Sequence, residues 1–271
     1  MAHRIVLVLT WIVFTAVGTR MGLAWNEVGH RRSVEKAIEA LPKPVKDFYK
    51  QRRNRLLEQV QDPSLRAPRL VFEVDRLEPF PFEELPETRE AAVAKYGEDK
   101  IGDVGDLPWR LVEAHQKLVE AFKEMDTEAI EAISAEVAYY VGEMYVPANL
   151  SRDGDGGPIG QEGLRERFDS RLLEMFGDKL KLDTPSARYL DRPAEYAVSI
   201  ARKSYVWVDN LLLNDYIARL GVTSYDRFYY DGLWLRVSWL VKQLLEDSAR
   251  DISSFWYTAW NLAGKPDLPK K

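Results

Sequence analysis

The stretch from Thr127 to Met144 constrains the fold most, because apolar residues recur along it every three or four positions. That spacing places them on one side of an α-helix and does not fit the two-residue alternation of a half-buried strand. Asp126 or Thr127 stands where a cap for the first helical turn is needed, and both residue types serve that purpose. We therefore expect a long helix with one buried face. The apolar positions are Ile130, Ile133, Val137, Tyr140, Val141 and Met144.

The rest of the chain shows the same kind of pattern. Helical spacing predicts further helices over residues 28–41, 48–62, 108–125, 164–176, 193–220 and 233–263. Asp106 is the expected N-cap of the helix that starts at Pro108. Proline in residues 63–88 and glycine in residues 151–160 predict irregular segments. Because no strand pattern and no fixed repeat is present, we expect a single all-α domain of several helices.

The first residues, MAHRIVLVLTWIVFTAVGTRMGLA, have the features of a secretory signal. Arg4 gives a positive start, Ile5 to Gly18 is an apolar run, and Gly22-Leu23-Ala24 offers small residues for cleavage. The run is too short for a comfortable transmembrane helix. We expect residues 1–24 to be removed, leaving a secreted or periplasmic domain over residues 25–271 with no transmembrane segment. An uncleaved N-terminal anchor is the alternative.

Composition restricts the available chemistry. The formal net charge of −5 argues against binding of duplex nucleic acid, whose phosphates require Lys and Arg. The chain has no cysteine, which excludes disulfides and cysteine nucleophiles. Of its three histidines, His3 lies in the signal and His115 lies outside any ligand motif, so we expect His115 to face solvent. Phe80, Phe82 and the Trp-rich last helix are expected to pack in the core, with a lipid-facing surface as the alternative.

The residues that could form a functional site lie in three motifs that are separated in the sequence. These are WNEVGH (25–30), YYVGEMYVPAN (139–149) and GLRERFD (163–169). Tyr139 and Glu143 are four residues apart, so they share one face of their predicted helix. The same spacing relates Arg165 to Asp169. Asn149 follows shortly after the end of the first of these helices.

Together these motifs resemble the zinc-dependent phospholipase C family, which includes the single-strand-specific nucleases of fungi and plants. In that family the signal is cut directly before a Trp whose amino group and carbonyl bind zinc, and a His on the first helix assists. The motifs His-Tyr-x-Gly-Asp-x-x-x-Pro-x-His and Gly-x-His-x-x-x-Glu/Asp complete a three-zinc cluster. The segments LVFEVDRLEPFPF (70–82) and SFWYTAWNLAG (254–264) also resemble family members. The resemblance implies an all-α domain of this type along nearly the whole mature chain.

The resemblance also implies which metal ligands are kept and which are lost. Kept or conservatively replaced ligands are Trp25, His30, Glu143, Asp169 and, in a shortened loop, Asp62. Positions that are His in active relatives hold Leu70, Tyr139, Asn149 and Arg165. Leucine has no donor atom, a phenol and an amide are weak ligands, and a guanidinium repels a dication. We therefore expect no full three-zinc cluster, and either no metal or a single zinc held by Trp25, His30 and Glu143.

Arg165 is expected to point inward and to neutralise Glu143 and Asp169 in place of zinc. Buried carboxylates without a metal need a cation, or else they must take up protons. On this basis Arg165→Ala would cost roughly 3–5 kcal/mol. The alternative is an ordinary surface pair between Arg165 and Asp169, which contributes a few tenths of a kcal/mol. Tyr139 and Asn149 are expected to hydrogen-bond within the same site.

Three functions are compatible with these features. The first is an exported, non-catalytic protein that binds a phosphate-containing small molecule or a lipid headgroup in the old cleft. The second is a phosphodiesterase in which a reduced metal site activates water against a phospholipid or nucleic-acid ester. The third is a structural envelope protein whose cleft is filled by Tyr139, Tyr145 and Arg165. The overall fold alone does not select among them, because function depends on the site.

Overall fold

The computed structural model describes residues 27–66 and 71–269. Over these residues the protein is all-α and contains no β-strand, which confirms the expected fold class. None of the helices described is long and apolar enough to cross a membrane. The predicted signal peptide and two of the site positions, Trp25 and Leu70, lie outside the described residues.

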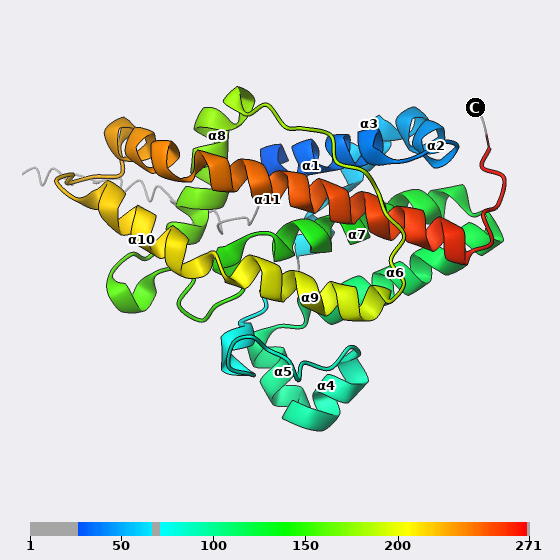
Figure 1. The fold of residues 1–271 in the computed structure, drawn as a ribbon, viewed down its shortest axis with the longest axis horizontal. Coiled ribbons are helices and arrows are strands. Elements are labelled where there is room, and N and C mark those ends of the chain that lie inside the picture. The colour runs from blue at the N-terminus through cyan, green and yellow to red at the C-terminus, as the bar shows by residue number, and fades with distance from the viewer. Residues whose placement is uncertain (1–26, 67–70, 270–271) are drawn as a thin grey trace, which may run out of the picture.

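The helices follow one another along the chain as shown in Figure 1. Their bounds are α1 Glu27–Ala40, α2 Val45–Gln51, α3 Arg53–Gln59, α4 Arg89–Tyr96, α5 Glu98–Val104, α6 Leu107–Glu124, α7 Thr127–Met144, α8 Leu172–Phe176, α9 Pro193–Tyr205, α10 Val208–Arg219 and α11 Arg227–Leu262. A π-helical segment, η5 (Glu166–Arg171), leads directly into α8. The predicted helices over 28–41, 108–125, 127–144 and 164–176 are therefore confirmed to within about two residues.

Two predicted helices are each divided in the structure. The expected helix over 48–62 becomes α2 and α3, and the one over 193–220 becomes α9 and α10. The break between α9 and α10 falls at Val206 and Trp207, where neither glycine nor proline signals it. The Trp207 ring instead meets Trp239 of α11 edge to face, with 5.4 Å between ring centroids. A tertiary contact thus accompanies the break, whereas the local sequence favours a continuous helix.

Helix α7 lies in the middle of the bundle. It contacts α1, α3, α6, α9 and α11, and most of its side chains are buried. The long helix α11 runs across the bundle, and α4 and α5 form a small lobe below it in the view of Figure 1. Packing on several sides explains why α7 is apolar beyond a single stripe, and why two of its acidic residues, Glu131 and Glu143, are buried as well.

The caps of the two central helices differ from each other. Asp126 caps α7 as predicted, because its carboxylate accepts hydrogen bonds from the backbone N–H groups of Glu128 at 3.1 Å and Ala129 at 3.0 Å. Asp106 occupies the N-cap position of α6 but makes no side-chain cap. Its carboxylate instead accepts a hydrogen bond from Arg110 Nε at 2.5 Å. The predicted helix start is right there, whereas the predicted capping bond is wrong.

The aromatic residues divide between core and surface. Phe82 and Trp256 are buried, and Trp256 stacks on Tyr49 with 4.5 Å between ring centroids. Phe80 and Trp239, in contrast, are 53% and 48% exposed. The expectation that the aromatic loop and the last helix pack wholly in the core is therefore wrong for these two side chains.

A buried ion pair joins η5 to α10. Arg167 Nη2 lies 3.1 Å from Asp215 Oδ1, and both side chains are buried. Asp215 also accepts hydrogen bonds from Gln161 Nε2 at 2.5 Å and from the Tyr229 hydroxyl. The carboxylate therefore has several donors around it, which is the condition under which a buried charge is tolerated.

Removing one partner of this pair should destabilise the fold strongly. Asp215→Ala leaves the Arg167 guanidinium buried without its counter-charge, so we expect the free energy of unfolding to fall by about 3–5 kcal/mol in urea denaturation. Asp231→Ala is the matched control, because it breaks an exposed pair with Arg227 and should change the same quantity by less than about 1 kcal/mol. Equal effects of the two substitutions would contradict the assignment.

Candidate functional site

Most of the predicted site residues meet at the C-terminal end of α7. The group, here called the polar cluster, combines residues of α1, α7, the 3₁₀ turn η3 (Pro147–Asn149) and the start of the η5 region. Its members are His30, Tyr139, Glu143, Asn149, Arg165 and Asp169. The cluster thus brings together three chain segments that are far apart in the sequence, as the motifs predict.

A buried hydrogen bond between α1 and α7 forms the centre of the polar cluster. His30 Nε2 donates to Glu143 Oε1 at 3.0 Å, and the two side chains are only 4% and 1% exposed. Tyr139, one helical turn before Glu143, stacks on the imidazole with 4.6 Å between ring centroids and 15° between planes. The imidazole is therefore fixed by a carboxylate at its edge and a phenol ring against its face.

Asn149 forms a hydrogen bond with the second oxygen of the Glu143 carboxylate. Its Nδ2 donates to Glu143 Oε2 at 3.2 Å and to the Glu143 carbonyl at 3.0 Å. The backbone carbonyl of Asn149 accepts a hydrogen bond from the Phe72 N–H at 2.8 Å. The side-chain amide therefore serves Glu143, whereas the backbone of the same residue connects the turn after α7 to the segment around residue 72.

Asp169 is a second carboxylate of the polar cluster and is fully buried. Burial raises its pKa well above the ordinary value, and the negative charge of Glu143 adds to the rise. A hydrogen bond from Ser170 Oγ at 2.8 Å and the positive charge of Arg165 oppose it. Asp169 belongs to the π-helical segment η5, a type of local geometry that often accompanies functional sites.

Arg165 does not neutralise the charges of Glu143 and Asp169 in the way that we expect from the sequence. It is half-buried, and its Nη2 donates to the Ala148 carbonyl at 3.0 Å. In the described part of the chain, Arg165 makes no ion pair with Glu143 or Asp169 within 4.0 Å, so the expected direct neutralisation is wrong. Its charge acts on Asp169 through space, which lowers the pKa of that carboxyl against the effect of burial.

The geometry changes the expected cost of removing Arg165. Arg165→Ala loses one charge-assisted hydrogen bond to a backbone carbonyl, and the side chain it removes is only half-buried. We expect the free energy of unfolding to fall by about 1.5–3 kcal/mol, less than a buried ion pair would give. Urea denaturation of the variant measures this, with Arg171→Ala on the exposed side of η5 as the control. A loss of less than about 1 kcal/mol would mean that Arg165 is an ordinary surface residue.

The other predicted ligand positions are not part of the polar cluster as described. Asp62 is exposed, and its carboxylate accepts a hydrogen bond from the Ser64 N–H at 2.8 Å, where a short 3₁₀ turn begins. This contact is a local turn interaction. Trp25 and Leu70 lie outside the described residues, so the proposed amino-terminal ligand is not placed.

The donor set does not fit a three-zinc centre. The polar cluster offers one imidazole and two carboxylates, and the remaining positions are a phenol ring, an amide and a guanidinium. Among the residues that the structure describes, no three His, Cys, Asp or Glu side chains are grouped as metal ligands. Several zinc ions in one site need many imidazole and carboxylate donors, and a fixed cation beside them opposes binding.

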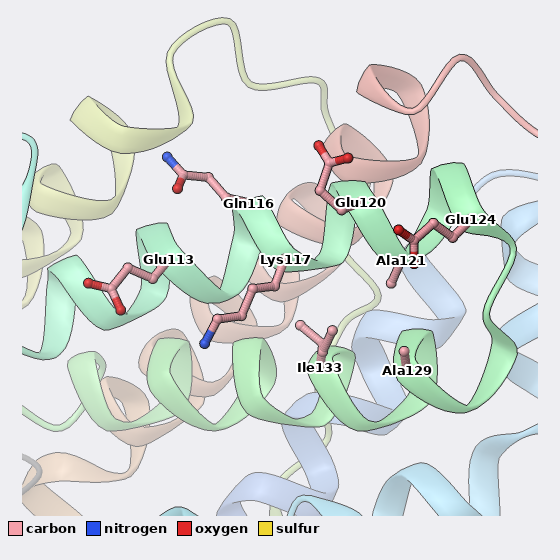
Figure 2. Close-up of a pocket in the computed structure, with 8 residues that line it drawn as sticks. All are labelled: Glu113, Gln116, Lys117, Glu120, Ala121, Glu124, Ala129 and Ile133. Atoms are coloured by element: carbon pink, nitrogen blue, oxygen red, sulfur yellow. The ribbon is translucent and has the colours of Figure 1, made fainter.

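The polar cluster also differs from the hollows on the surface of the bundle. A hollow of about 750 Å³ lies between α6 and the first half of α7 (Figure 2). Ala121, Ala129 and Ile133 form its apolar floor. Glu113, Gln116, Lys117, Glu120 and Glu124 line it from α6. Three carboxylates against one ammonium make this hollow a poor site for an anionic phosphate ester.

The environment of His115 in the structure differs from the one that we expect from the sequence. It is 4% exposed and packs edge to face on Phe255 of α11, with 5.3 Å between ring centroids. Burial lowers its pKa to about 4, although a hydrogen bond to the backbone of Phe255 opposes the shift. The expectation of a solvent-facing histidine is therefore wrong, because this part of α6 is covered by α11.

A buried neutral histidine makes stability depend on pH. The pKa of His115 is near 4 in the folded protein and about 6.5 in the unfolded chain, so the unfolded chain takes up the proton first on acidification. Between pH 6.5 and pH 4 this group should lower the free energy of unfolding by about 1.4 kcal/mol per pH unit at most. Urea denaturation at a series of pH values should show a shallower decline for His115→Gln than for the wild type. Parallel curves would show that His115 titrates normally.

Comparisons with known proteins do not assign the chain to a family. No protein-family model matches the sequence, and no curated protein matches it. The resemblance to the zinc-dependent phospholipase C family therefore depends on the motifs and on the geometry of the residues that they contain.

Proposed function

We propose that this chain is an exported, metal-depleted relative of the zinc-dependent phospholipases C that has no phosphodiesterase activity and acts as a binding protein. The proposal rests on the polar cluster. Three of the positions where active relatives have His are held here by Tyr139, Asn149 and Arg165, and all three lie around the matching residues His30, Glu143 and Asp169. Replacement of ligands within one assembled site is what loss of a metal centre would leave.

The contacts of the replaced residues support this proposal further. A phenol ring stacks on the imidazole and an amide bonds to the carboxylate, so each substitution contributes a packing or hydrogen-bonding contact in the interior. The replacement is incomplete, because Asn149 Oδ1, Arg165 Nε and Asp169 Oδ2 are buried without a hydrogen-bond partner among the described residues, as the loss of a metal would leave them. Arg165 is the half-buried cation of the polar cluster. A phosphate-containing molecule is the class of ligand that this cation would attract.

A phosphodiesterase with one metal ion is the second candidate. It is favoured by the convergence of His30 Nε2 and Glu143 Oε1, an imidazole and a carboxylate from different helices that lie within 3.0 Å of each other. With the amine and carbonyl of Trp25, five residues before His30, they would supply the ligands of a single zinc. Bound there, the metal would supply an activated water for attack on a phosphate ester.

A structural envelope protein is the third candidate. It is favoured by Tyr145, which is buried next to the end of α7 and donates a hydrogen bond to Asp251 of α11 at 2.6 Å. Tyr139 is also buried, and it stacks on His30 in the polar cluster. Such packing serves stability without a ligand.

Metal content and hydrolysis separate these candidates. We expect the exported protein, purified without chelator, to contain almost no zinc and to leave bis(p-nitrophenyl) phosphate intact even after zinc is added. One equivalent of zinc, together with hydrolysis that His30→Ala abolishes, would support the single-metal enzyme instead. Intact mass of the same sample reports whether the chain begins at Trp25. Failure to bind phosphate or phosphocholine by calorimetry would favour the structural candidate.

A matched gain-of-ligand variant tests the assignment of the positions. The triple substitution Tyr139→His, Asn149→His and Arg165→His returns three imidazoles to the polar cluster and removes the fixed cation. We expect this variant to bind zinc that the wild type does not bind, as measured by elemental analysis after dialysis. A folded triple variant that still binds none would show that these positions do not correspond to the zinc ligands of the family.

A further inference from the structure

Exposed apolar side chains are concentrated on one hairpin of the protein. In the described part of the chain twelve large hydrophobic residues are exposed, and seven of them lie between residues 213 and 239, on α10, α11 and the turn between them. We call the six most regularly spaced of these the hairpin surface. They are Leu213, Tyr216, Leu220, Phe228, Leu235 and Trp239. Concentrations of this kind mark interaction sites.

The hairpin surface follows the outer faces of two helices that pack against each other. On α11, Phe228, Leu235 and Trp239 recur at helical spacing, opposite to the face that is buried in the core. On α10 the exposed apolar positions recur in the same way, opposite the buried Leu211 and Asp215. Trp207 meets Trp239 edge to face, so the two helices form one continuous apolar region at that end.

The charges around the hairpin surface are few and mostly balanced. Arg227 pairs with Asp231 at 3.0 Å. Arg219 and Arg236 donate hydrogen bonds to backbone carbonyls, and neither forms an ion pair with any carboxylate that the structure describes. An apolar region with aromatic residues and two guanidinium groups available for phosphate has the composition of a helix surface that lies at a lipid interface.

We propose that the hairpin surface inserts into the headgroup region of a lipid bilayer. Figure 1 shows α10 and the first half of α11 at one end of the molecule. The first turn of α1 lies near the same end. A Cβ at Gly177 would come within 3.0 Å of the Val28 side chain, and Phe176 stacks on Trp234 of α11 with 5.0 Å between ring centroids.

The chain before α1 contains the apolar run Ile5–Gly18. If that run were retained as an anchor, its place in the chain would keep this end of the bundle, and the hairpin surface with it, close to the bilayer. The inference does not require retention, because the hairpin carries its own apolar residues and cations. It is also independent of the proposed function, because no residue of the polar cluster belongs to the hairpin surface.

The shape of the hairpin favours a lipid over a second copy of the chain. Side chains that stand on the outside of two helices form a ridged surface, and the hollows described on the protein are lined by other residues. A stable protein interface needs a complementary surface, whereas a bilayer adapts to the residues inserted into it. The half-buried cations Arg219 and Arg236, which have no ion-pair partner among the described residues, would repel their equivalents if a symmetric dimer brought them together.

The absence of cysteine allows a direct test in the full chain. Leu235→Cys and Leu213→Cys each introduce a unique thiol for the fluorophore NBD, and Leu262→Cys, at an exposed aliphatic residue at the C-terminal end of α11, is the matched control. On addition of vesicles of phosphatidylcholine with a minority of phosphatidylglycerol, we expect NBD emission to rise and shift to the blue at 235 and 213. Emission at 262 should not change. A lipid carrying a quencher should quench only the hairpin labels.

The double variant Leu213→Gln, Leu235→Gln measures the contribution of the hairpin surface. Its partitioning into the same vesicles should be at least about tenfold weaker than that of the wild type. Binding carried only by residues 1–26 would leave the hairpin labels unchanged and would overturn the inference. So would a lipid-independent change at 235 that grows with protein concentration and accompanies a doubled mass in light scattering, because that result would identify self-association.

Discussion

The hydrogen bond between His30 and Glu143 is the interaction on which the arrangement of the polar cluster depends. A carboxylate as buried as Glu143 is strongly destabilising unless donors surround it. His30 from α1 and Asn149 from the turn after α7 supply those donors, one to each carboxylate oxygen. Because the buried Glu143 carboxylate requires these donors, it fixes the relative position of α1, α7 and the turn after α7. Through the bond from Phe72 to the Asn149 carbonyl it also positions the segment that passes beside them.

Asp169 is a second buried carboxyl group, and unlike Glu143 it does not have, in the described part of the chain, a hydrogen-bond donor for each of its oxygens. Ser170 donates to one oxygen of Asp169, the other oxygen has no hydrogen-bond partner among the described residues, and Arg165 is directed to the Ala148 carbonyl. Burial then raises the pKa of Asp169, so that uptake of a proton limits the charge of the polar cluster. Three separate means therefore stabilise the interior: a hydrogen-bonded carboxylate, a carboxyl with a raised pKa and a cation acting through space. No single one of them could be inferred from the four-residue spacing of Arg165 and Asp169.

The fold class and most helix positions could be predicted from the sequence because they depend on local periodicity and caps, as in α7 with Asp126. The meeting of His30, Glu143 and Asn149 could also be predicted, but only through the resemblance of their motifs to those of a known family. Features that depend on distant contacts could not. Arg167 and Asp215 are 48 residues apart in the chain, and no sequence motif links the two positions. The burial of His115 likewise depends on α11 covering α6. The direct ion pair expected for Arg165 was wrong because a nearby carbonyl competes for the guanidinium.

The two faces of α11 show why aromatic content alone does not locate a core. A helix of 36 residues is about 54 Å long, which exceeds the usual diameter of a small domain. Other helices therefore cannot surround it along its whole length. Trp256, in the second half, is enclosed by the bundle, whereas Trp239, in the first half, has α10 on one side and an exposed face on the other. The same residue type thus serves internal packing at one end of the helix and forms an outward surface toward the other.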